Sequence, residues 1–228
     1  MAHYKSIVHI GTHKTGTTSI QNFLWQRREW LRDHGYAFYQ GMHIGDNHAE
    51  LHASAMRAHR NSPFRHVTKL LCDQAYKDDV RRRVDEFAAA NEENRLIFSA
   101  EGLSYLRYED EFDWLAGLMP APVLIVVYLR NRVDFLRSYK GEMEKHGLSG
   151  SDCRDSVAYT NEDTWLLDYD ERLTPFRERF GCDHVVSIDY DDAVEREVSV
   201  IPSFLRVLGL CEHVTEEETR IFLNRSPR

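Results

Sequence analysis

Apolar positions along the chain follow two patterns, short continuous runs and longer stretches with an apolar residue at every third or fourth position. The run VLIVVYL at 123–129 is apolar throughout, which is typical of a strand buried on both faces, as in a parallel sheet. The stretch DDVRRRVDEFAAANEEN at 78–94 places Val80, Val84 and Phe87 along one stripe. That spacing predicts an amphipathic helix.

Strands and helices are predicted to alternate along the whole chain. The predicted strands are residues 6–10, 35–41, 95–99, 123–129 and 184–190. The predicted helices are residues 17–31, 78–94, 109–119, 131–147, 200–210 and 215–223. This order predicts a single domain over residues 1–228, with a three-layer α/β/α fold around a mostly parallel sheet. Ligands of such sheets bind beyond the carboxyl ends of the strands, so the residues after each strand are candidates for function.

Composition and charge narrow the class of protein. The 228 residues are 42% hydrophobic and 29% charged, as in ordinary globular proteins, and the net charge of −8 argues against binding to nucleic acid or anionic membranes. Apolar runs are too short to cross a bilayer, and the N-terminus lacks the pattern of a secretion signal. The four cysteines lie far apart without a CxxC pair. We therefore expect a cytoplasmic protein with reduced thiols and no metal site.

The residues after the first predicted strand form a candidate phosphate-binding loop. The sequence GTHKTGTT at 11–18 combines glycines, a lysine and the start of a helix, and backbone N–H groups at a helix start bind anions. Hydroxyl groups are supplied by Thr15, Thr17, Thr18 and Ser19. In the common nucleoside-triphosphate loop the lysine follows the second glycine. Here Lys14 precedes Gly16.

The segment HIGTHKTGTTSIQ resembles the 5′-phosphosulfate loop of sulfotransferases that use 3′-phosphoadenosine 5′-phosphosulfate (PAPS). Those enzymes have the pattern Lys-[Ser/Thr]-Gly-Thr-[Thr/Ser] within a P-loop NTPase-like fold. The resemblance implies that Lys14 contacts the oxygen between phosphate and sulfate, and that Thr15, Gly16, Thr17, Thr18 and Ser19 hold the phosphosulfate. Many members have proline before the lysine, whereas this chain has His13. We expect a surface or capping histidine, with a contact to the sulfate acceptor as the alternative.

Two later segments also resemble the family. In VVYLRNRVDFLRS, Arg130 ends a predicted strand and Ser138 follows eight residues later, which implies a pair that binds the 3′-phosphate. Arginine and serine suit this role because they donate hydrogen bonds to phosphate oxygens. In VVSIDYDDAVE, the resemblance implies that Tyr190 contacts the adenine. Arg225, in the final LNRSPR, is a further candidate for the 3′-phosphate.

The acceptor's proton needs a base near the loop. Glu101 follows the predicted strand 95–99, at a position where the family carries a catalytic histidine or glutamate, and it is the favoured candidate. His48, with Glu50, is the second candidate, in GMHIGDNHAELH after strand 35–41. His146 is a weaker one.

The resemblance implies a bacterial enzyme that moves a sulfuryl group from PAPS to a hydroxyl or amine of a small-molecule, glycan or lipid acceptor, without a metal. The polar residues of 39–77 and 141–165 favour a polar acceptor. The alternatives are an ATP-dependent phosphotransferase, which predicts a Gly-Lys order absent from this loop, and a nucleotide-binding module without turnover.

Overall fold

A computed structural model describes residues 4–148 and 150–220. Its centre is a sheet of five strands in the order β2-β3-β1-β4-β5, with every neighbouring pair parallel. The strands are β1 (Ser6–His9), β2 (Tyr36–Phe38), β3 (Arg95–Ser99), β4 (Val123–Leu129) and β5 (Val185–Asp189). The predicted parallel α/β fold is confirmed, and each predicted strand has a counterpart.

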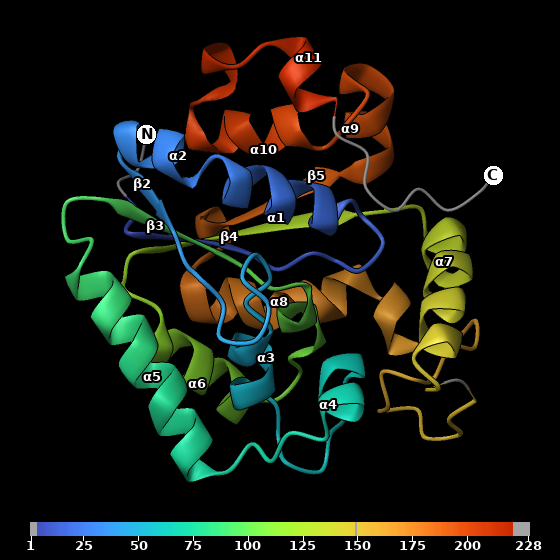
Figure 1. Cartoon of the computed structure of the whole chain (residues 1–228). Coiled ribbons are helices and arrows are strands. Elements are labelled where there is room, and N and C mark those ends of the chain that lie inside the picture. The colour runs from blue at the N-terminus through green and yellow to red at the C-terminus, as the bar shows by residue number, and fades with distance from the viewer. Residues whose placement is uncertain (1–3, 149, 221–228) are drawn as a thin grey trace.

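Helices cover both faces of the sheet (Figure 1). One face is covered by α1 (Thr17–Gln26), α2 (Arg28–Asp33), α9 (Tyr190–Glu197), α10 (Ile201–Leu208) and α11 (Glu216–Thr219). Below the other face lie α3 (Ala49–Ala55), α4 (Pro63–Thr68), α5 (Gln74–Ala89), α6 (Glu109–Leu118) and α8 (Tyr169–Phe180). The helix α7 (Arg132–Lys145) stands at one end of the sheet, beside the loop that leads into α1.

The strands alternate their side chains between two hydrophobic cores. Val8 and Ile125 belong to the core shared with α3, α5, α6 and α8, whereas Ile7 and Val126 belong to the core shared with α1 and α10. Successive side chains of a strand point to opposite faces, so a strand covered on both sides must be apolar at every position. The continuous run at 123–129 is explained by this burial.

The helices differ in detail from the predicted ones. The stretch 17–31 forms two helices, α1 and α2, separated at Arg27. Helix α5 begins at Gln74 because the side chain of Asp73 caps it, accepting a hydrogen bond from the backbone N–H of Tyr76. The helices α3, α4, α8 and α9 were not predicted. Three of them have eight residues or fewer, and α8 contains Pro175. The end of predicted helix 215–223, and Arg225, lie outside the described residues.

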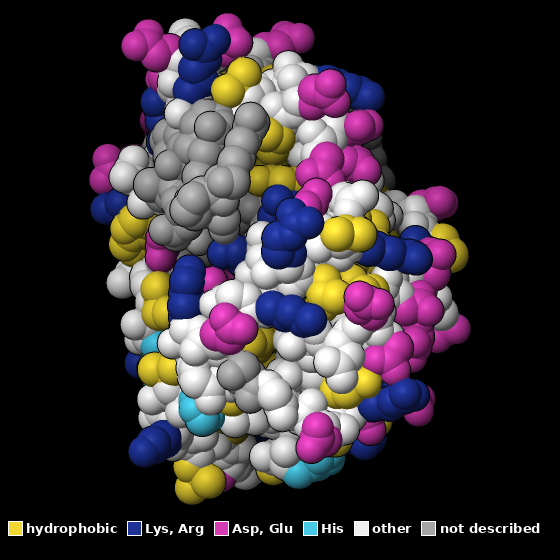
Figure 2. All heavy atoms as spheres, turned by 90° about the vertical axis from the view of Figure 1, so that its right-hand side faces the viewer, with side chains coloured by type: hydrophobic (Ala, Val, Ile, Leu, Met, Phe, Trp, Pro, Cys, Tyr) yellow, Lys and Arg dark blue, Asp and Glu magenta, His cyan; other side chains and the backbone are white. Residues whose placement is uncertain are grey.

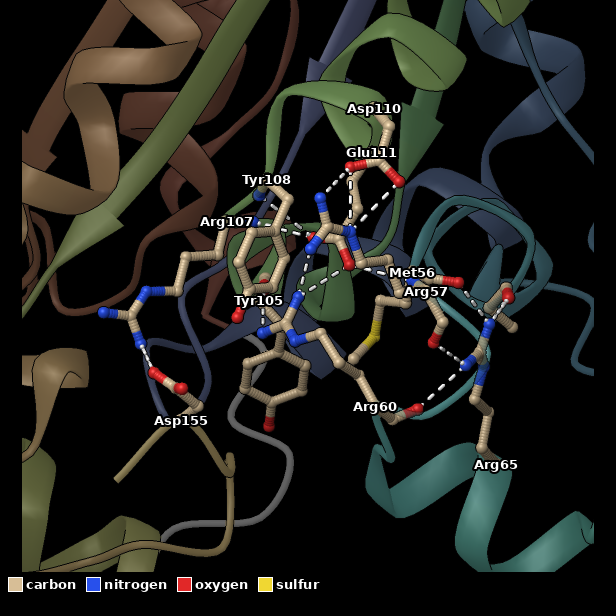
Figure 3. Close-up of polar contacts among 11 residues, drawn as sticks. Met56, Arg57, Arg60, Arg65, Tyr105, Arg107, Tyr108, Asp110, Glu111 and Asp155 are labelled. Carbon is tan, nitrogen blue, oxygen red and sulfur yellow. Dashed lines mark hydrogen bonds and ion pairs between the residues drawn. The ribbon is translucent and has the colours of Figure 1, made fainter. Parts of the chain in front are cut away.

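A buried ion pair fixes the segment after α3 against the start of α6 (Figure 3). Arg60 donates to Glu111 at 2.6 Å, and the backbone N–H groups of Arg57 and Arg107 donate to the same carboxylate. Arg65 donates to four backbone carbonyls, those of residues 53, 56, 57 and 60. A buried charge is tolerated when its hydrogen-bonding capacity is used in this way.

Parallel pairing brings several loops to one edge of the sheet. His9 is in register with Ser99 of β3 and with Val126 of β4. Residues 11–18 therefore lie between the segment after β3 and the segment after β4. The first of these is a 3₁₀ helix, η1 (Glu101–Tyr105), and the second leads into α7. In the part of the chain that the structure describes, no helix is both long and apolar enough to cross a membrane.

Candidate active site

The loop after β1 is a tight turn with three residues in the left-handed region. The φ angles of Gly11, Lys14 and Gly16 are 90°, 64° and 77°, and turns of this type direct backbone N–H groups toward an anion. A Cβ on Gly11 would lie 3.0 Å from the Cβ of Glu101, so glycine is needed for the close packing against η1. Lys14 adopts a conformation that is uncommon outside glycine, which is frequent at functional sites.

The hydroxyl groups of the loop divide into two kinds. Thr15 and Thr17 are buried, and both donate to the carbonyl of Thr12, at 2.6 and 3.2 Å. These two threonines hold the loop in shape. Thr18 is exposed in the first turn of α1, and the backbone N–H of the buried Ser19 donates to the carbonyl of Gly16. The groups that the loop presents to a ligand are therefore its backbone, which the two threonines fix, and the N-terminus of α1.

Arg130 and Ser138 lie beside this loop. The guanidinium of Arg130 donates to the Ser138 hydroxyl and to the carbonyl of Lys14, both at 3.2 Å, and so joins residues 116 positions apart. The side chain of Arg130 lies 5.2 Å from the ring centroid of Tyr190. The Tyr169 hydroxyl donates a hydrogen bond of 2.7 Å to the backbone carbonyl of Arg130, which fixes the backbone at this position. The residues expected at the two phosphates and the adenine are therefore adjacent.

Arg130 has the properties of an anion-binding residue. It is partly exposed, and within the described residues it forms no ion pair, while its buried Nε has no hydrogen-bond partner there. An arginine that lies close to such a turn and is not neutralised by a carboxylate suits an anionic ligand. Lys14 and the α1 N-terminus add positive potential at the same place. The donors present therefore fit a nucleotide with a 5′ and a 3′ anionic group.

Glu101 opens η1 and packs against the loop at Gly11 and His13. Its side chain is 28% exposed, and its Oε1 lies 3.9 Å from Nε2 of His13. Burial, and then the charge of Glu142, raise the pKa of Glu101 to about 7, against the opposing charge of Lys14. A carboxyl group with a pKa near neutrality is suited to accept a proton at physiological pH.

His13 is neither a surface nor a capping residue, contrary to the expectation from sequence. It is 8% exposed, stacks on the Tyr105 ring at 4.5 Å, and forms a hydrogen bond of 2.9 Å with the Tyr105 hydroxyl. The Tyr105 and Tyr139 hydroxyl groups are hydrogen-bonded to each other, with their oxygens 2.9 Å apart. Burial, followed by His52, Arg172 and Lys14, holds the pKa of His13 well below its ordinary value, so its ring is neutral. The rings of His13 and Tyr105 form a wall beside Glu101.

Glu142 was not recognised from the sequence, and it contacts the loop lysine directly. Its Oε2 lies 3.3 Å from Nζ of Lys14, and its Oε1 lies 3.2 Å from Nε2 of His146. Burial alone would raise the pKa of Glu142, but Lys14 and His146 hold it below the ordinary value. Its spacing provided a signal, because Glu142 follows Ser138 by four residues and lies on the same face of α7.

His48 and Glu50 are not brought together with the loop. His48 is 0% exposed and packs against the rings of Phe38 and Tyr39, while its Nδ1 accepts a hydrogen bond of 2.9 Å from the Ser99 N–H. Burial lowers the pKa of His48 to about 3. Glu50 is also 0% exposed, and burial raises its pKa to about 7. The predicted catalytic role of His48 is corrected to that of a core residue at the end of β3.

The rim of the site has mixed charge. Figure 2 views the end of the molecule that carries α7, and Lys and Arg side chains are interspersed there with Asp and Glu side chains. Across residues 4–148 and 150–220, no group of three or more His, Cys, Asp or Glu side chains is placed to hold a metal ion. The positive groups that face the site come from the loop and from Arg130.

Comparisons with known proteins identify the fold. No protein-family model matches the sequence, and no curated protein matches it significantly. Among solved structures, the chain is similar to a sulfotransferase from Alicyclobacillus acidocaldarius, with a TM-score of 0.60, 17% identity, and 98% of this chain and 87% of that chain covered. It is also similar to the sulfotransferase domain from the curacin biosynthetic pathway, with a TM-score of 0.54, 14% identity, and 93% and 75% covered. The fold is therefore that of the sulfotransferases.

Proposed function

We propose that the chain is a sulfotransferase that moves a sulfuryl group from PAPS to a hydroxyl or amine of a polar acceptor. The observation that carries this proposal is the contact of Arg130 with both Ser138 and the carbonyl of Lys14. That contact joins an arginine and a serine, which are able to donate to a 3′-phosphate, to the loop for which we propose the 5′-phosphosulfate, and it therefore supports the proposal. ATP has no 3′-phosphate, so an ATP-binding site would not need the Arg130–Ser138 pair.

In the proposed reaction, the acceptor oxygen or nitrogen attacks the sulfur, and the bond from sulfur to the bridging oxygen breaks. Negative charge then develops on the phosphate that leaves as part of 3′-phosphoadenosine 5′-phosphate (PAP). Lys14 and the backbone N–H groups at the start of α1 stabilise that charge, which is the largest contribution that a preorganised site makes. Tyr190, beside Arg130, holds the adenine.

Glu101 takes the proton that the acceptor loses. Its position against the loop, next to His13, and its pKa of about 7 support this role. The wall of His13 and Tyr105 shields one side of the carboxyl group from water. His48 and Glu50 have no part in this scheme, because their side chains are buried in the core.

Cofactor selectivity tests the proposal. The affinities of PAP and AMP, which differ by the 3′-phosphate, are compared by calorimetry for the wild type and Arg130→Ala. We expect the wild type to prefer PAP and the variant to lose most of this preference, about a hundredfold for a bidentate charged contact. Arg137→Ala is the matched control, because Arg137 lies in the helix α7 that follows Arg130 and 76% of its side chain is exposed. Equal affinity of the wild type for PAP and AMP would contradict the proposal.

Transfer is then measured with ³⁵S-labelled PAPS and a panel of sugars, amino alcohols, phenols and lipid head groups. We expect labelled product with a polar acceptor and without added magnesium. An ATP-dependent phosphotransferase predicts instead magnesium-dependent ATP hydrolysis, and that result would replace the proposal. Binding of PAP without transfer to any acceptor would favour a module without turnover.

A further inference from the structure

Before substrate binds, Lys14 is paired with an acid from the chain itself. Its Nζ lies 3.3 Å from Oε2 of Glu142, with the two side chains only 17% and 27% exposed. A pair shielded to this degree is screened less than a surface pair. The proposed reaction needs Lys14 at the bridging oxygen. In this structure, Lys14 is bound to Glu142 instead.

The phosphosulfate and Glu142 compete for this lysine. The 5′-phosphate and the sulfate are both anionic, and a single ammonium group cannot neutralise them and the carboxylate at once. When Lys14 turns to the bridging oxygen, Glu142 is left as a negative charge close to the sulfuryl group and to Glu101. Like charges in a partly buried site repel one another, so the arrangement is unfavourable unless another cation replaces Lys14.

The cations that the described structure places next to Glu142 are weak replacements. Lys145 lies 3.8 Å from Oε2, but 71% of its side chain is exposed, and exposed ion pairs contribute little. His146 lies 3.2 Å from the other oxygen, Oε1, with 35% of its side chain exposed. Lys14 contacts Glu142 on Oε2, which is therefore the oxygen on the side of the loop.

The neighbouring segment, residues 151–164, is also acidic. It has four acidic residues and one basic residue, Arg154. Two contacts fix it beside the wall of the site. The Tyr139 hydroxyl donates to the Val157 carbonyl at 2.9 Å, and Arg107 pairs with Asp155 at 2.6 Å (Figure 3). Because Asp163 also pairs with Arg154, at 2.7 Å, the excess negative charge of the segment comes from the exposed Asp152 and Glu162, and such an excess attracts cationic ligands.

We propose, on the basis of the sulfotransferase function above, that the acceptor is an amino alcohol or amino sugar, and that Glu142 binds its ammonium group. The ammonium group takes the place of Lys14 on Oε2, while Lys14 moves to the phosphosulfate. A hydroxyl group of the same acceptor attacks the sulfur, its proton passes to Glu101, and PAP leaves. Glu142 therefore selects the acceptor by charge.

A binding experiment tests the exchange of partners. PAP affinity is measured by calorimetry for the wild type and Glu142→Gln, at constant ionic strength, with and without ethanolammonium chloride. Without the amine, we expect Glu142→Gln to bind PAP several-fold more tightly, because Lys14 no longer has to leave a carboxylate. Ethanolammonium should tighten PAP binding to the wild type by roughly fivefold, and should have no such effect on Glu142→Gln.

Two controls separate this effect from general electrostatics. Glu144→Gln removes an exposed acid from the same helix and should behave as the wild type. Ethylene glycol, and potassium chloride at the concentration of the amine, should leave PAP affinity unchanged. A PAP affinity of Glu142→Gln equal to that of the wild type, together with no effect of ethanolammonium, would overturn the inference. If this inference fails but the wild type still binds PAP more tightly than AMP, the proposed sulfotransferase function stands without a role for Glu142.

Turnover provides the second readout. Amino sugars are compared with the matching neutral sugars, such as glucosamine with glucose, in the transfer of ³⁵S from PAPS. We expect the wild type to have the higher kcat/KM for the amino member of a pair, and Glu142→Gln to lose this preference mainly through KM. The inference would also be overturned if the wild type preferred the neutral sugar and Glu142→Gln showed the same preference.

Discussion

The nucleotide side and the acceptor side of the candidate site are assembled differently. In the proposed enzyme, the nucleotide side consists of Lys14 to Thr18 of the turn, Arg130, Ser138 and Tyr190. The turn, Arg130 and Tyr190 follow the strands β1, β4 and β5, and Ser138 lies in α7. The acceptor side consists of His13, Glu101 and Glu142, together with the segment 151–164. These residues are held by buried rings, by hydrogen bonds and by the Lys14–Glu142 ion pair, all between distant elements. One side relies on backbone geometry, and the other on side-chain packing.

This difference indicates which groups bind the nucleotide and which groups select the acceptor. Phosphate groups are the same in every nucleotide, so a turn and a helix start suffice to bind them. An acceptor must be distinguished by its shape and charge, which requires side chains from several elements. We therefore expect substitutions on the two sides to separate nucleotide affinity from turnover, and four predictions test that separation.

The largest effect is expected for Glu101→Gln. Without a base, kcat should fall by about 10² to 10⁴-fold, while PAP affinity stays nearly unchanged. The pKa of about 7 predicts that wild-type kcat/KM falls as the pH decreases through 7, because the protonated carboxyl group cannot accept a proton. A pH–rate profile of both proteins provides the measurement. Glu93→Gln, at an exposed site, is the control, and an unchanged acid limb in Glu101→Gln would exclude Glu101 as the base.

Lys14→Ala should have the next largest effect. The loss of a cation at the leaving group should lower kcat by about 10² to 10³-fold, with a smaller loss of PAP affinity. Single-turnover measurements with ³⁵S-labelled PAPS separate the two effects. Lys140→Ala, an exposed lysine of α7, should match the wild type. A variant that loses binding but not turnover would assign Lys14 to the nucleotide alone.

Tyr190→Ala should weaken PAP binding by about tenfold, since it removes a ring that supports the guanidinium of Arg130. Its kcat at saturating PAPS should remain close to that of the wild type. Tyr190→Phe keeps the ring and should retain most of the affinity. Calorimetry with PAP measures both variants, and a fall in kcat without a change in affinity would place Tyr190 on the acceptor side.

His13→Ala should have the smallest effect on rate and a distinct effect on pH dependence. Removal of the ring exposes Glu101 to water, so burial no longer raises its pKa to the same extent. The acid limb of the pH–rate profile should then move to lower pH by about one unit. Tyr139→Phe, which keeps the ring and removes one hydroxyl, should shift the limb less. An unmoved acid limb in His13→Ala would show that the wall does not control Glu101.

The sequence predicted more of the nucleotide side than of the acceptor side. Lys14, Arg130, Ser138 and Tyr190 belong to short motifs at strand ends, and a parallel sheet brings such ends together. His13 was expected at the surface, because nothing nearby in the sequence indicates its stacking on Tyr105, 92 residues away. His48 was assigned a catalytic role from its place after a strand, whereas its ring is enclosed by the core. Glu142 went unnoticed because its partner, Lys14, is 128 residues away.

By itself, the sequence predicted the five strands, the parallel α/β fold and a Gly-containing turn at 11–18. These follow from local periodicity and from residues such as Gly11 and Gly16, whose backbone freedom is encoded at one position. Only the tertiary structure decided which carboxylates surround Lys14 and which histidines are buried. Contacts between side chains far apart in sequence depend on how the helices pack, and burial then sets the pKa values, as it does for Glu101 and His48.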